Sequence, residues 1–443
     1  MRKRNSNYLK KVLLSATIIG SMSLSSTSAI AETEVTNFTE LQSAIVQGTT
    51  SDIKLGNNIT DVSSTISLTS ANTIVNINGN NNAISPNGTG YSLFDIQANT
   101  SLKLRDAIIS NASSNGNGGA IKNNSGTLNI IDSTFSNNTA NGSVYGGAID
   151  VQSGSVLNIS GQTTFSGNTV TEGSGGAIHN LGNTVIAGTD STNLVTFDGN
   201  KAKWNGGGIY NQGTATIDRA SFNSNSATQK GGAIYTTGNL TVRNSSFTGN
   251  TSTVANPNWQ YGGGAIQQDS GSLTIDNSNF DGNITNSRGG AIHLLRNNVT
   301  ISNSTFTGNK AGSGDGGAIA LTSSDAAATI TNSSLTDNSA RLGGAIFNEG
   351  NLTIVADGTD SQISGNTSTQ NGGAIYNRAA TLNLQTQNGG SITFSGNNAA
   401  AGSDVYLDTA TSPTRHSTLN ILGDGTVTFN GSIAGSNGNV NHT

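Results

Sequence analysis

The sequence predicts an all-β protein: a right-handed, single-stranded, three-sheet parallel β-helix with a short N-terminal capping helix. The first observation is a Gly-Gly-Ala-Ile or Gly-Gly-Gly-Ile element that recurs ten times at intervals of 25 to 32 residues. The second is a Phe-x-x-Asn element that precedes it, and the third is a short apolar-polar alternation between them. Repeats of this length stack as units that cannot bury their apolar faces alone. The Gly-Gly elements end at Ile121, Ile149, Ile178, Ile209, Ile234, Ile266, Ile292, Ile319, Ile346 and Ile375.

Residues 1–31 have the pattern of a cleaved signal peptide. Five Lys and Arg residues open the chain, the run from Val12 to Gly20 is mostly apolar, and residues 29–31 (Ala-Ile-Ala) fit an A-x-A cleavage site. The alternative is a transmembrane anchor, but the run is short and rich in Ser and Thr, whereas a bilayer span needs about 20 apolar residues. We therefore expect the chain to be exported.

The charge balance excludes some classes of partner. The chain has 20 Lys and Arg and 25 Asp and Glu, and 5 of the basic residues lie in residues 1–31, so the remainder carries 15 − 25 = −10. Nucleic acids and anionic lipids bind clustered basic residues, so we predict no nucleic-acid partner. The chain has no cysteine, and the fold must hold without disulfides, although an oxidising compartment would permit them.

Residues 32–50 are predicted to form the N-terminal cap. Asn37 and Glu40 fit a capping box, the apolar residues that follow share one helical face, and Gly48 can end the helix. The exposed ends of stacked β-repeats need such caps. Residues 51–117 follow with looser strand patterns and no Gly-Gly signature. We expect them to form the opening rungs of the coil.

Residues 118–407 contain the Gly-Gly and Phe-x-x-Asn repeats, and residues 231–250 illustrate one unit. Ile234 begins a strand after the Gly pair, Leu240 and Val242 alternate with polar residues as in a half-buried strand, and Phe247 opens a third strand. Three short strands and three turns make one rung, and parallel stacking of rungs buries the Ile, Leu and Phe columns. A leucine-rich repeat would need a Leu framework, and a β-propeller needs four strands over 40 or more residues.

Two columns of identical residues should support the stack. The phenylalanines are expected in one interior column, in which Leu335 and Ile363 replace the ring twice. The asparagines are expected at one turn, where Asn tolerates left-handed geometry and stacked amides hydrogen-bond to the next rung. The Phe column comprises Phe135, Phe165, Phe197, Phe222, Phe247, Phe280, Phe306 and Phe394. The Asn column comprises Asn138, Asn168, Asn200, Asn225, Asn250, Asn283, Asn309, Asn338, Asn366 and Asn397.

Residues 408–443 are predicted to form terminal rungs. They end without a capping helix, which favours a longer natural product over a poorly capped rod. The longest gap between an Asn of the column and the next Gly pair runs from Asn250 to Gly263 and contains Pro257 and Trp259. We expect it to leave the rod as a loop, and aromatic residues on loops are frequently functional.

The repeated GGAI and FxxN elements resemble those of the polymorphic outer membrane proteins of chlamydiae and related bacterial autotransporter passengers. GGAI begins at nine glycines and GGGI at Gly206, so the resemblance covers residues 118–407. It implies a surface-displayed right-handed β-helix, often an adhesin, exported through a C-terminal outer-membrane barrel. This chain ends in Asn-His-Thr and has no cysteine, whereas the chlamydial members commonly contain cysteines. Contact with the outer membrane is therefore expected only through a barrel absent from this chain.

A carbohydrate-active enzyme is the main alternative, because parallel β-helices also host polysaccharide lyases and glycoside hydrolases. Such sites need converging carboxylates, often with Arg, Lys or Ca²⁺. On the outward position after each repeat Ile the charges are isolated, and we expect His179 and His293 to be solvated surface residues. Asp315, Asp325 and Asp337 lie close in sequence without an evident basic partner. We predict no enzyme, and no catalytic, cofactor-binding or metal-binding residue.

Aromatic residues provide the candidate binding surface. Exposed rings could stack on sugars or receive the apolar side chains of a partner, or they could simply stack on each other and stabilise the sheet. We predict an exported bacterial surface or passenger protein, a monomeric rod with adhesin-like binding to a host-cell receptor, a matrix protein or a glycan. The candidate residues are Tyr210, Tyr235, Trp259, Tyr261, Phe347, Tyr376 and Tyr406.

Overall fold

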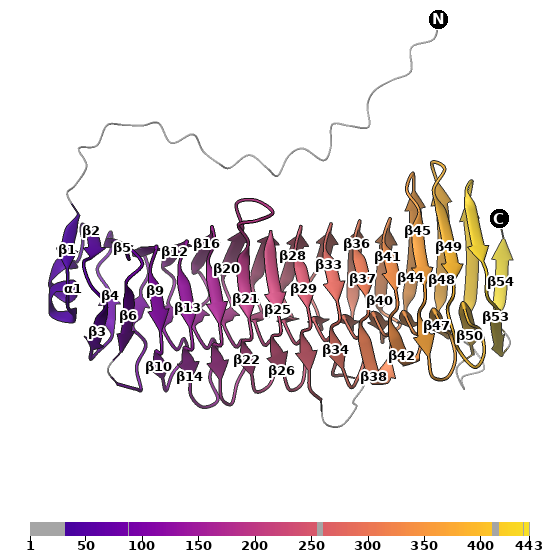
Figure 1. Ribbon diagram of the computed structural model, residues 1–443, viewed down its shortest axis with the longest axis horizontal. Helices are drawn as coiled ribbons and strands as arrows, with labels where there is room; N and C mark the ends of the chain where they lie inside the picture. The colour runs from indigo at the N-terminus through magenta and orange to yellow at the C-terminus, as the bar shows by residue number, and fades with distance from the viewer. Residues whose placement is uncertain (1–31, 87, 255–259, 410–415, 437, 443) are drawn as a thin grey trace, which may run out of the picture.

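The computed structural model describes residues 32–86, 88–254, 260–409, 416–436 and 438–442. These residues form one long rod of stacked rungs, with a short helix at its N-terminal end (Figure 1). All strand pairs are parallel, and each strand pairs with its counterparts one turn before and one turn after it. The predicted parallel β-helix is confirmed. The predicted signal peptide and Trp259 lie outside the described residues.

Sheet A has 16 strands and contains the half-buried alternating segments of the repeats. In β28, for example, the Leu and Val side chains point to the core and the Thr between them points outward. Its strands are β1 (Thr33–Val35), β2 (Thr50–Leu55), β5 (Ile74–Asn78), β8 (Ser101–Arg105), β12 (Thr127–Ile131), β16 (Val156–Ser160), β20 (Asn183–Ala187), β24 (Thr214–Asp218), β28 (Asn239–Arg243), β32 (Leu273–Asp276), β36 (Asn297–Ser302), β40 (Ala326–Thr331), β44 (Asn351–Asp357), β48 (Thr381–Gln387), β51 (Thr418–Gly423) and β54 (Asn439–His442).

Sheet B has 14 strands and carries the phenylalanine column. Its strands are β3 (Ile59–Val62), β6 (Ala83–Pro86), β9 (Ile108–Ser110), β13 (Thr134–Ser136), β17 (Thr164–Ser166), β21 (Val195–Asp198), β25 (Ala220–Asn223), β29 (Ser246–Thr248), β33 (Asn279–Asp281), β37 (Thr305–Thr307), β41 (Ser334–Thr336), β45 (Ser361–Ser364), β49 (Ser391–Ser395) and β52 (Thr426–Phe429).

Sheet C also has 14 strands, and its repeat strands begin at the Ile of each Gly-Gly element. Its strands are β4 (Ile66–Leu68), β7 (Phe94–Ile96), β11 (Ile121–Asn123), β15 (Ile149–Val151), β19 (Ile178–Asn180), β23 (Ile209–Asn211), β27 (Ile234–Thr236), β31 (Ile266–Gln268), β35 (Ile292–Leu294), β39 (Ile319–Leu321), β43 (Ile346–Asn348), β47 (Ile375–Arg378), β50 (Val405–Asp408) and β53 (Ile433–Ser436).

A fourth sheet, D, adds to the three expected sheets. Most of its ten strands are only two residues long, and they lie between the Asn column and the Gly pair of the same rung. A two-residue strand has no alternation to reveal it in a sequence. Its strands are β10 (Ser113–Ser114), β14 (Thr139–Ala140), β18 (Thr169–Val170), β22 (Lys201–Ala202), β26 (Ser226–Ala227), β30 (Thr251–Ser252), β34 (Ile284–Thr285), β38 (Lys310–Asp315), β42 (Ser339–Leu342) and β46 (Thr367–Ser368).

The N-terminal end is closed by helix α1 (Phe38–Ala44). The Asn37 side chain accepts a hydrogen bond from the backbone N–H of Glu40 at 3.0 Å, as the capping-box pattern predicted. Phe38 and Leu41 are buried against the first rung. The helix therefore removes apolar surface from water at the end of the core. Among the described residues, no helix has the length and apolarity to cross a membrane.

The phenylalanines form the predicted interior column. Rings on adjacent rungs stack in near-parallel planes with centroids 4.6–5.0 Å apart from Phe135 to Phe306. Each of these rings is fully buried. Since a buried aromatic ring removes 150 Å² or more of surface from water, this column is a large apolar contribution in every rung that contains it.

The asparagine column is buried, and its geometry differs from the prediction. In Asn168, the backbone N–H and Nδ2 both donate to Oδ1 of Asn200, and Nδ2 also donates to the carbonyl oxygen of Phe135 at 2.9 Å. The expected amide ladder is thus confirmed. The prediction that these asparagines adopt left-handed backbone geometry is wrong. The residue before each asparagine has the positive φ instead, as Gly167 does with φ +63°.

The Gly pairs form the tight bend before sheet C. Gly146 has φ +69°, which favours glycine. Gly147 needs glycine for a different reason, because a Cβ there would lie 2.0 Å from the carbonyl oxygen of Gly176 in the next rung. Neighbouring backbones therefore approach too closely for any side chain at the second position of the pair.

Candidate functional site

The outer face of sheet C, called here the covered face, carries the outward column that follows each repeat Ile. Side chains from the chain segments between sheet D and the Gly pairs lie over it: Tyr145 on His179, Lys230 on Tyr235 and Arg288 on Phe347. Side chains that point away from the central core are therefore still enclosed. Tyr235, Phe347 and Tyr376 are 7%, 0% and 5% exposed. The expectation that these rings form an exposed strip is wrong, because the sequence pattern separates the two faces of a strand but does not show what covers the outer one.

The tyrosine cluster lies on this face and consists of Tyr145, Tyr210, Tyr235 and Tyr261. Tyr210 and Tyr235 stack on adjacent rungs with ring centroids 5.1 Å apart. Tyr145 comes from the covering segment, and its ring lies 6.0 Å from that of Tyr210. Tyr145, Tyr210 and Tyr261 are half-buried. Each therefore has one part held by the protein and another part open to solvent.

Lys230 and Asp269 fix the centre of the tyrosine cluster. The Lys230 ammonium pairs with the Asp269 carboxylate at 2.5 Å, and the Tyr235 hydroxyl donates to the same carboxylate at 2.7 Å. The Lys230 Nζ also lies 5.1 Å from the Tyr235 ring centroid and 6.0 Å from that of Tyr261. Burial, together with the charge of Asp269, raises the pKa of Tyr235, and burial raises the pKa of Tyr210 to about 12. Both phenols are therefore neutral hydrogen-bond donors at physiological pH.

His179 and Asp150 form a buried pair beside the cluster. Nδ1 of His179 lies 2.6 Å from Oδ1 of Asp150, and Nε2 lies 2.9 Å from Oε1 of Gln212. The Tyr145 ring stacks on the imidazole at 4.6 Å. The prediction that His179 is a solvated surface residue is wrong, and so is that for His293, because the covering segments leave them 2% and 0% exposed. Both ring nitrogens of His179 are already hydrogen-bonded, which leaves neither free to act as a base or metal ligand.

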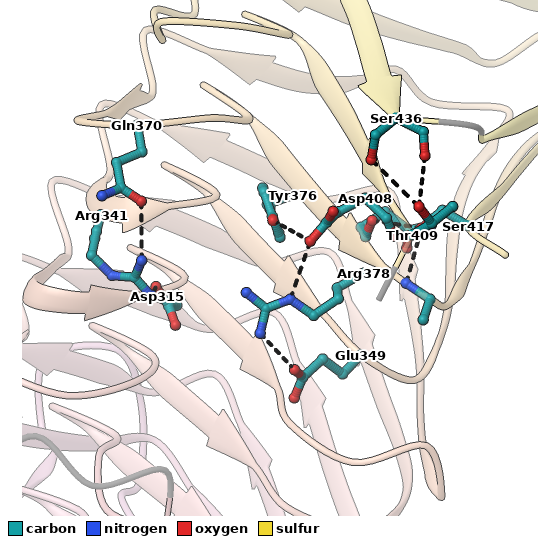
Figure 2. Close-up of polar contacts among 12 residues, drawn as sticks. Asp315, Arg341, Glu349, Gln370, Tyr376, Arg378, Asp408, Thr409, Ser417 and Ser436 are labelled. Atoms are coloured by element: carbon teal, nitrogen blue, oxygen red, sulfur yellow. Dashed lines mark hydrogen bonds and ion pairs between the residues drawn. The ribbon is translucent and has the colours of Figure 1, made fainter. Parts of the chain in front are cut away.

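An arginine–carboxylate network occupies the C-terminal part of the covered face (Figure 2). Asp315 pairs with Arg288 at 3.6 Å and with Arg341 at 2.7 Å. The prediction that Asp315 lacks a basic partner is therefore wrong. The sequence could not show it, since Arg288 and Arg341 belong to the preceding and following rungs.

The network continues through Glu349 to Asp408. Glu349 pairs with Arg288 at 3.7 Å and with Arg378 at 3.2 Å, and Arg378 pairs with Asp408 at 3.4 Å. The Tyr376 hydroxyl also donates to Asp408. The network thus contains three arginines and three carboxylates, so its charges cancel. The arginines are Arg288, Arg341 and Arg378, and the carboxylates are those of Asp315, Glu349 and Asp408. Arg288 thereby ties its covering segment to the rod, and the mutual pairing of these six groups leaves no excess charge among them to attract an ion.

Aromatic rings fill the space between these charges. Phe347, Tyr376 and Tyr406 stack with centroid distances of 5.7 and 5.4 Å. The guanidinium groups of Arg288 and Arg378 lie 5.2 and 5.1 Å from the Phe347 ring.

Burial raises the pKa of the Asp315 carboxyl, although Arg341 and Arg288 oppose the shift. Burial also raises the pKa of Tyr376 to about 12.

The structure thus gathers the predicted aromatic residues into two groups on one face. Tyr210, Tyr235 and Tyr261 belong to the tyrosine cluster, and the stack from Phe347 to Tyr406 belongs to the network, where Tyr406 is half-buried. Trp259 lies outside the described residues. Sequence reasoning missed the partners Tyr145, Lys230, Asp269, Arg288 and Arg378. Tyr145, Lys230 and Arg288 lie in the segments before the Gly pairs, where the sequence has no periodicity that could predict their positions. The only available signal was that charged and aromatic residues occur in these segments.

Among the described residues, no group of three His, Asp or Glu side chains is placed to hold a metal ion.

Sequence comparisons match residues 183–367 to a family described as the right handed beta helix region. Residues 132–152, 162–181 and 360–378 match the Chlamydia polymorphic membrane protein repeat. The chain is a right-handed β-helix, and parts of it match the polymorphic membrane protein repeat. This repeat family implies a protein of the cell surface or outer membrane.

No curated protein matches the chain. One solved structure, described as "L. reuteri 53608 SRRP", is similar at 15% identity, with 92% of this chain and 100% of that chain covered and a TM-score of 0.31.

Proposed function

We propose that this protein is an exported, monomeric β-helical rod that is displayed on a bacterial surface and acts as an adhesin. The repeats of the polymorphic membrane protein family and the β-helix support a surface or passenger role. The signal-peptide pattern of residues 1–31 supports export. The stacked Phe and Asn columns make the rod self-supporting, so its outer positions can differ from rung to rung without loss of the core.

The observation that carries the adhesive role is the tyrosine cluster. Tyr145, Tyr210 and Tyr261 are half-buried, and the amphipathic side chain of Lys230 lies beside the Tyr261 ring. Rings that are held in place lose little conformational freedom when a partner binds, and tyrosine offers both an apolar face and a hydroxyl. The cluster therefore suits a glycan or an apolar and polar patch of a host-cell receptor or matrix protein.

The test is binding of the purified protein to immobilised extracellular-matrix proteins and to a glycan array. Protease treatment of intact cells of the source bacterium should also remove the protein if it is displayed. A variant with Tyr145→Ala and Tyr210→Ala should lose binding about tenfold or more, since ring truncation at a binding centre costs over 1 kcal/mol. The matched control is Thr216→Ala with Thr241→Ala on the outer face of sheet A in neighbouring rungs. Equal binding by both variants would refute the role of the cluster.

We favour binding over catalysis because the acidic side chains of the covered face are already paired. Asp150 is held by His179 and Gln152, Asp269 by Lys230, and Glu349 by two arginines. A glycosidase needs one carboxyl group free to donate a proton and another to act on the sugar. Release of reducing ends or unsaturated sugars from polysaccharides by the purified protein would favour the enzymatic alternative instead.

A further inference from the structure

We propose that the corner between sheets A and B binds an extended, uncharged polysaccharide. The site, called here the corner groove, has a volume of about 430 Å³ and runs along the rod over successive turns. It lies on a different corner of the rod from the covered face, since it joins sheets A and B. The inference deepens the adhesive function proposed above by naming the ligand class of a second surface.

A raised loop makes the first wall of the groove. The corners of the floor are turns of one or two residues, such as Asn244-Ser245 between β28 and β29. Between β20 and β21 the corner is instead the seven-residue segment 188–194, which projects above its neighbours in Figure 1. The Asp190 carboxylate fixes this loop by accepting hydrogen bonds from the backbone N–H groups of Thr192 and Asn193 at 2.8 and 2.9 Å.

Longer strands make the opposite wall. β44 extends to Asp357 and β48 to Gln387, and both project beyond the floor in Figure 1. Asn332, in the last floor turn, anchors this wall because its Oδ1 accepts from the Asp357 N–H at 2.8 Å. Five turns of one or two residues lie between the two walls, so the floor is about 24 Å long at the spacing of parallel strands. The cavity of about 430 Å³ lies over the four turns nearest the raised loop. A ligand that fills it must be elongated.

The floor presents a row of carboxamides. Asn244, Asn277 and Asn303 are exposed and occupy the same position of successive turns, with φ of +50°, +46° and +50°. Neighbouring groups use only part of their hydrogen-bonding capacity. Nδ2 of Asn277 donates to Oδ1 of Asn244 at 2.7 Å, and Nδ2 of Asn303 donates to Asp276 at 2.9 Å. A carboxamide has two donors and two acceptor lone pairs, so donors and acceptors remain for a ligand rich in hydroxyl groups.

The composition of the groove selects against other ligand classes. Among its described lining residues only Arg219 is charged, and it is paired with Asp218. Arg243, exposed beside the floor, lies between Asp218 and Asp276 of the adjacent strands. An acidic polymer would therefore meet no excess of positive charge here. An extended peptide needs a free strand edge or pockets for its apolar side chains. The strands beneath the groove are paired on both sides, and Leu194 is its one large apolar side chain among the described lining residues.

The test is affinity electrophoresis of the full-length mature protein in gels that contain galactomannan, dextran, polygalacturonate or unfolded casein. We expect at least one of the two neutral polymers to retard the protein. A variant with Asn277→Gly and Asn303→Gly should lose about tenfold or more of that affinity, because each lost hydrogen bond contributes about 1 kcal/mol. Glycine tolerates the left-handed turn. The isosteric variant Asn277→Asp with Asn303→Asp, which removes the same donors, should also bind more weakly.

Asn80→Gly is the matched control, because Asn80 is exposed with φ +50° at the same corner of an N-terminal rung outside the groove. It should bind as the wild type does. Unchanged retardation of both double variants, no retardation by either neutral polymer, or retardation by polygalacturonate or casein alone would overturn the proposal. The Tyr145→Ala and Tyr210→Ala variant should keep its polysaccharide binding, so failure of the tyrosine cluster is distinguishable from failure of the groove.

Discussion

Asn168 contacts Asn200 of the next rung through two hydrogen bonds: its backbone N–H and its Nδ2 both donate to Oδ1 of Asn200, at 3.0 and 2.9 Å. Both residues are fully buried. Asn200 makes the same pair of contacts to Asn225. Each carboxamide therefore satisfies donors of the rung before it and depends on an acceptor of the rung after it.

Asn200→Ala should destabilise the rod strongly. It removes the acceptor of two buried Asn168 donors and the donor to the Phe165 carbonyl. Since each buried unsatisfied group costs about 1–3 kcal/mol, the expected loss is about 3 kcal/mol or more. Urea unfolding followed by circular dichroism measures it. Asn183→Ala, at an exposed position of β20, should change the stability by no more than about 0.5 kcal/mol. Similar effects of the two substitutions would contradict the role of the ladder.

Phe222→Ala should cost about 3–5 kcal/mol, the usual range for truncation of a buried ring. The Phe222 ring stacks between Phe197 and Phe247 at 4.6 and 4.8 Å. Phe222→Leu should cost clearly less, because Leu335 occupies the same column beside Phe306 and is fully buried there. Thermal unfolding of both variants gives the comparison. An equal loss for the two variants would show that ring stacking matters more than filled volume.

Gly232→Ala should destabilise the protein more than Gly199→Ala. A Cβ at Gly232 would lie 2.1 Å from the carbonyl oxygen of Gly264, a backbone atom that cannot move aside alone. At Gly199 no atom lies within 4 Å of the position that a Cβ would occupy. Alanine there should therefore lose only the free energy of a left-handed conformation at φ +63°, about 1–2 kcal/mol. Comparison of the two melting temperatures tests whether rung contact, rather than turn geometry, requires the second glycine of the pair.

Stability should fall as the pH is lowered from about 6.5 towards 3, in part through His293. Burial, with a contribution from Arg288, lowers the pKa of His293 to about 3. The unfolded chain binds a proton near the ordinary pKa of about 6.5, whereas the folded chain does not. The stabilisation is therefore complete above pH 6.5 and is lost as the pH falls through this window.

His293→Gln should flatten this dependence when unfolding is measured in urea at several pH values. Glutamine fits the site in principle, since Gln267 occupies the paired position of the neighbouring rung. His416→Gln is the control, because His416 is exposed. A His293→Gln variant with the same pH dependence as the wild type would show that other groups cause the acid sensitivity.

The sequence was sufficient to predict which residues form the core, but not which residues cover the outer face of sheet C. Phe135, Asn138 and Ile149 belong to columns whose members are identical or similar in successive rungs, so alignment of the chain with itself shows which positions stack. Tyr145 and Arg288 act on the rungs beside them from irregular segments, and no period links them to His179 or Glu349. Burial of the outward column therefore depends on contacts that a repeat pattern does not encode.

The uniform ladders have a consequence at the level of the gene. In this part of the rod the column asparagine and the second glycine of the pair each meet their own kind in the rungs above and below. Deletion or duplication of the segment between Gly206 and Gly231 would therefore rejoin matching partners. Such an event, of the sort that unequal recombination between repeats produces, would shorten or lengthen the molecule by about 4.8 Å and keep the packing of the remaining interior unchanged. The length of the rod can thus change by whole rungs without a change in its core.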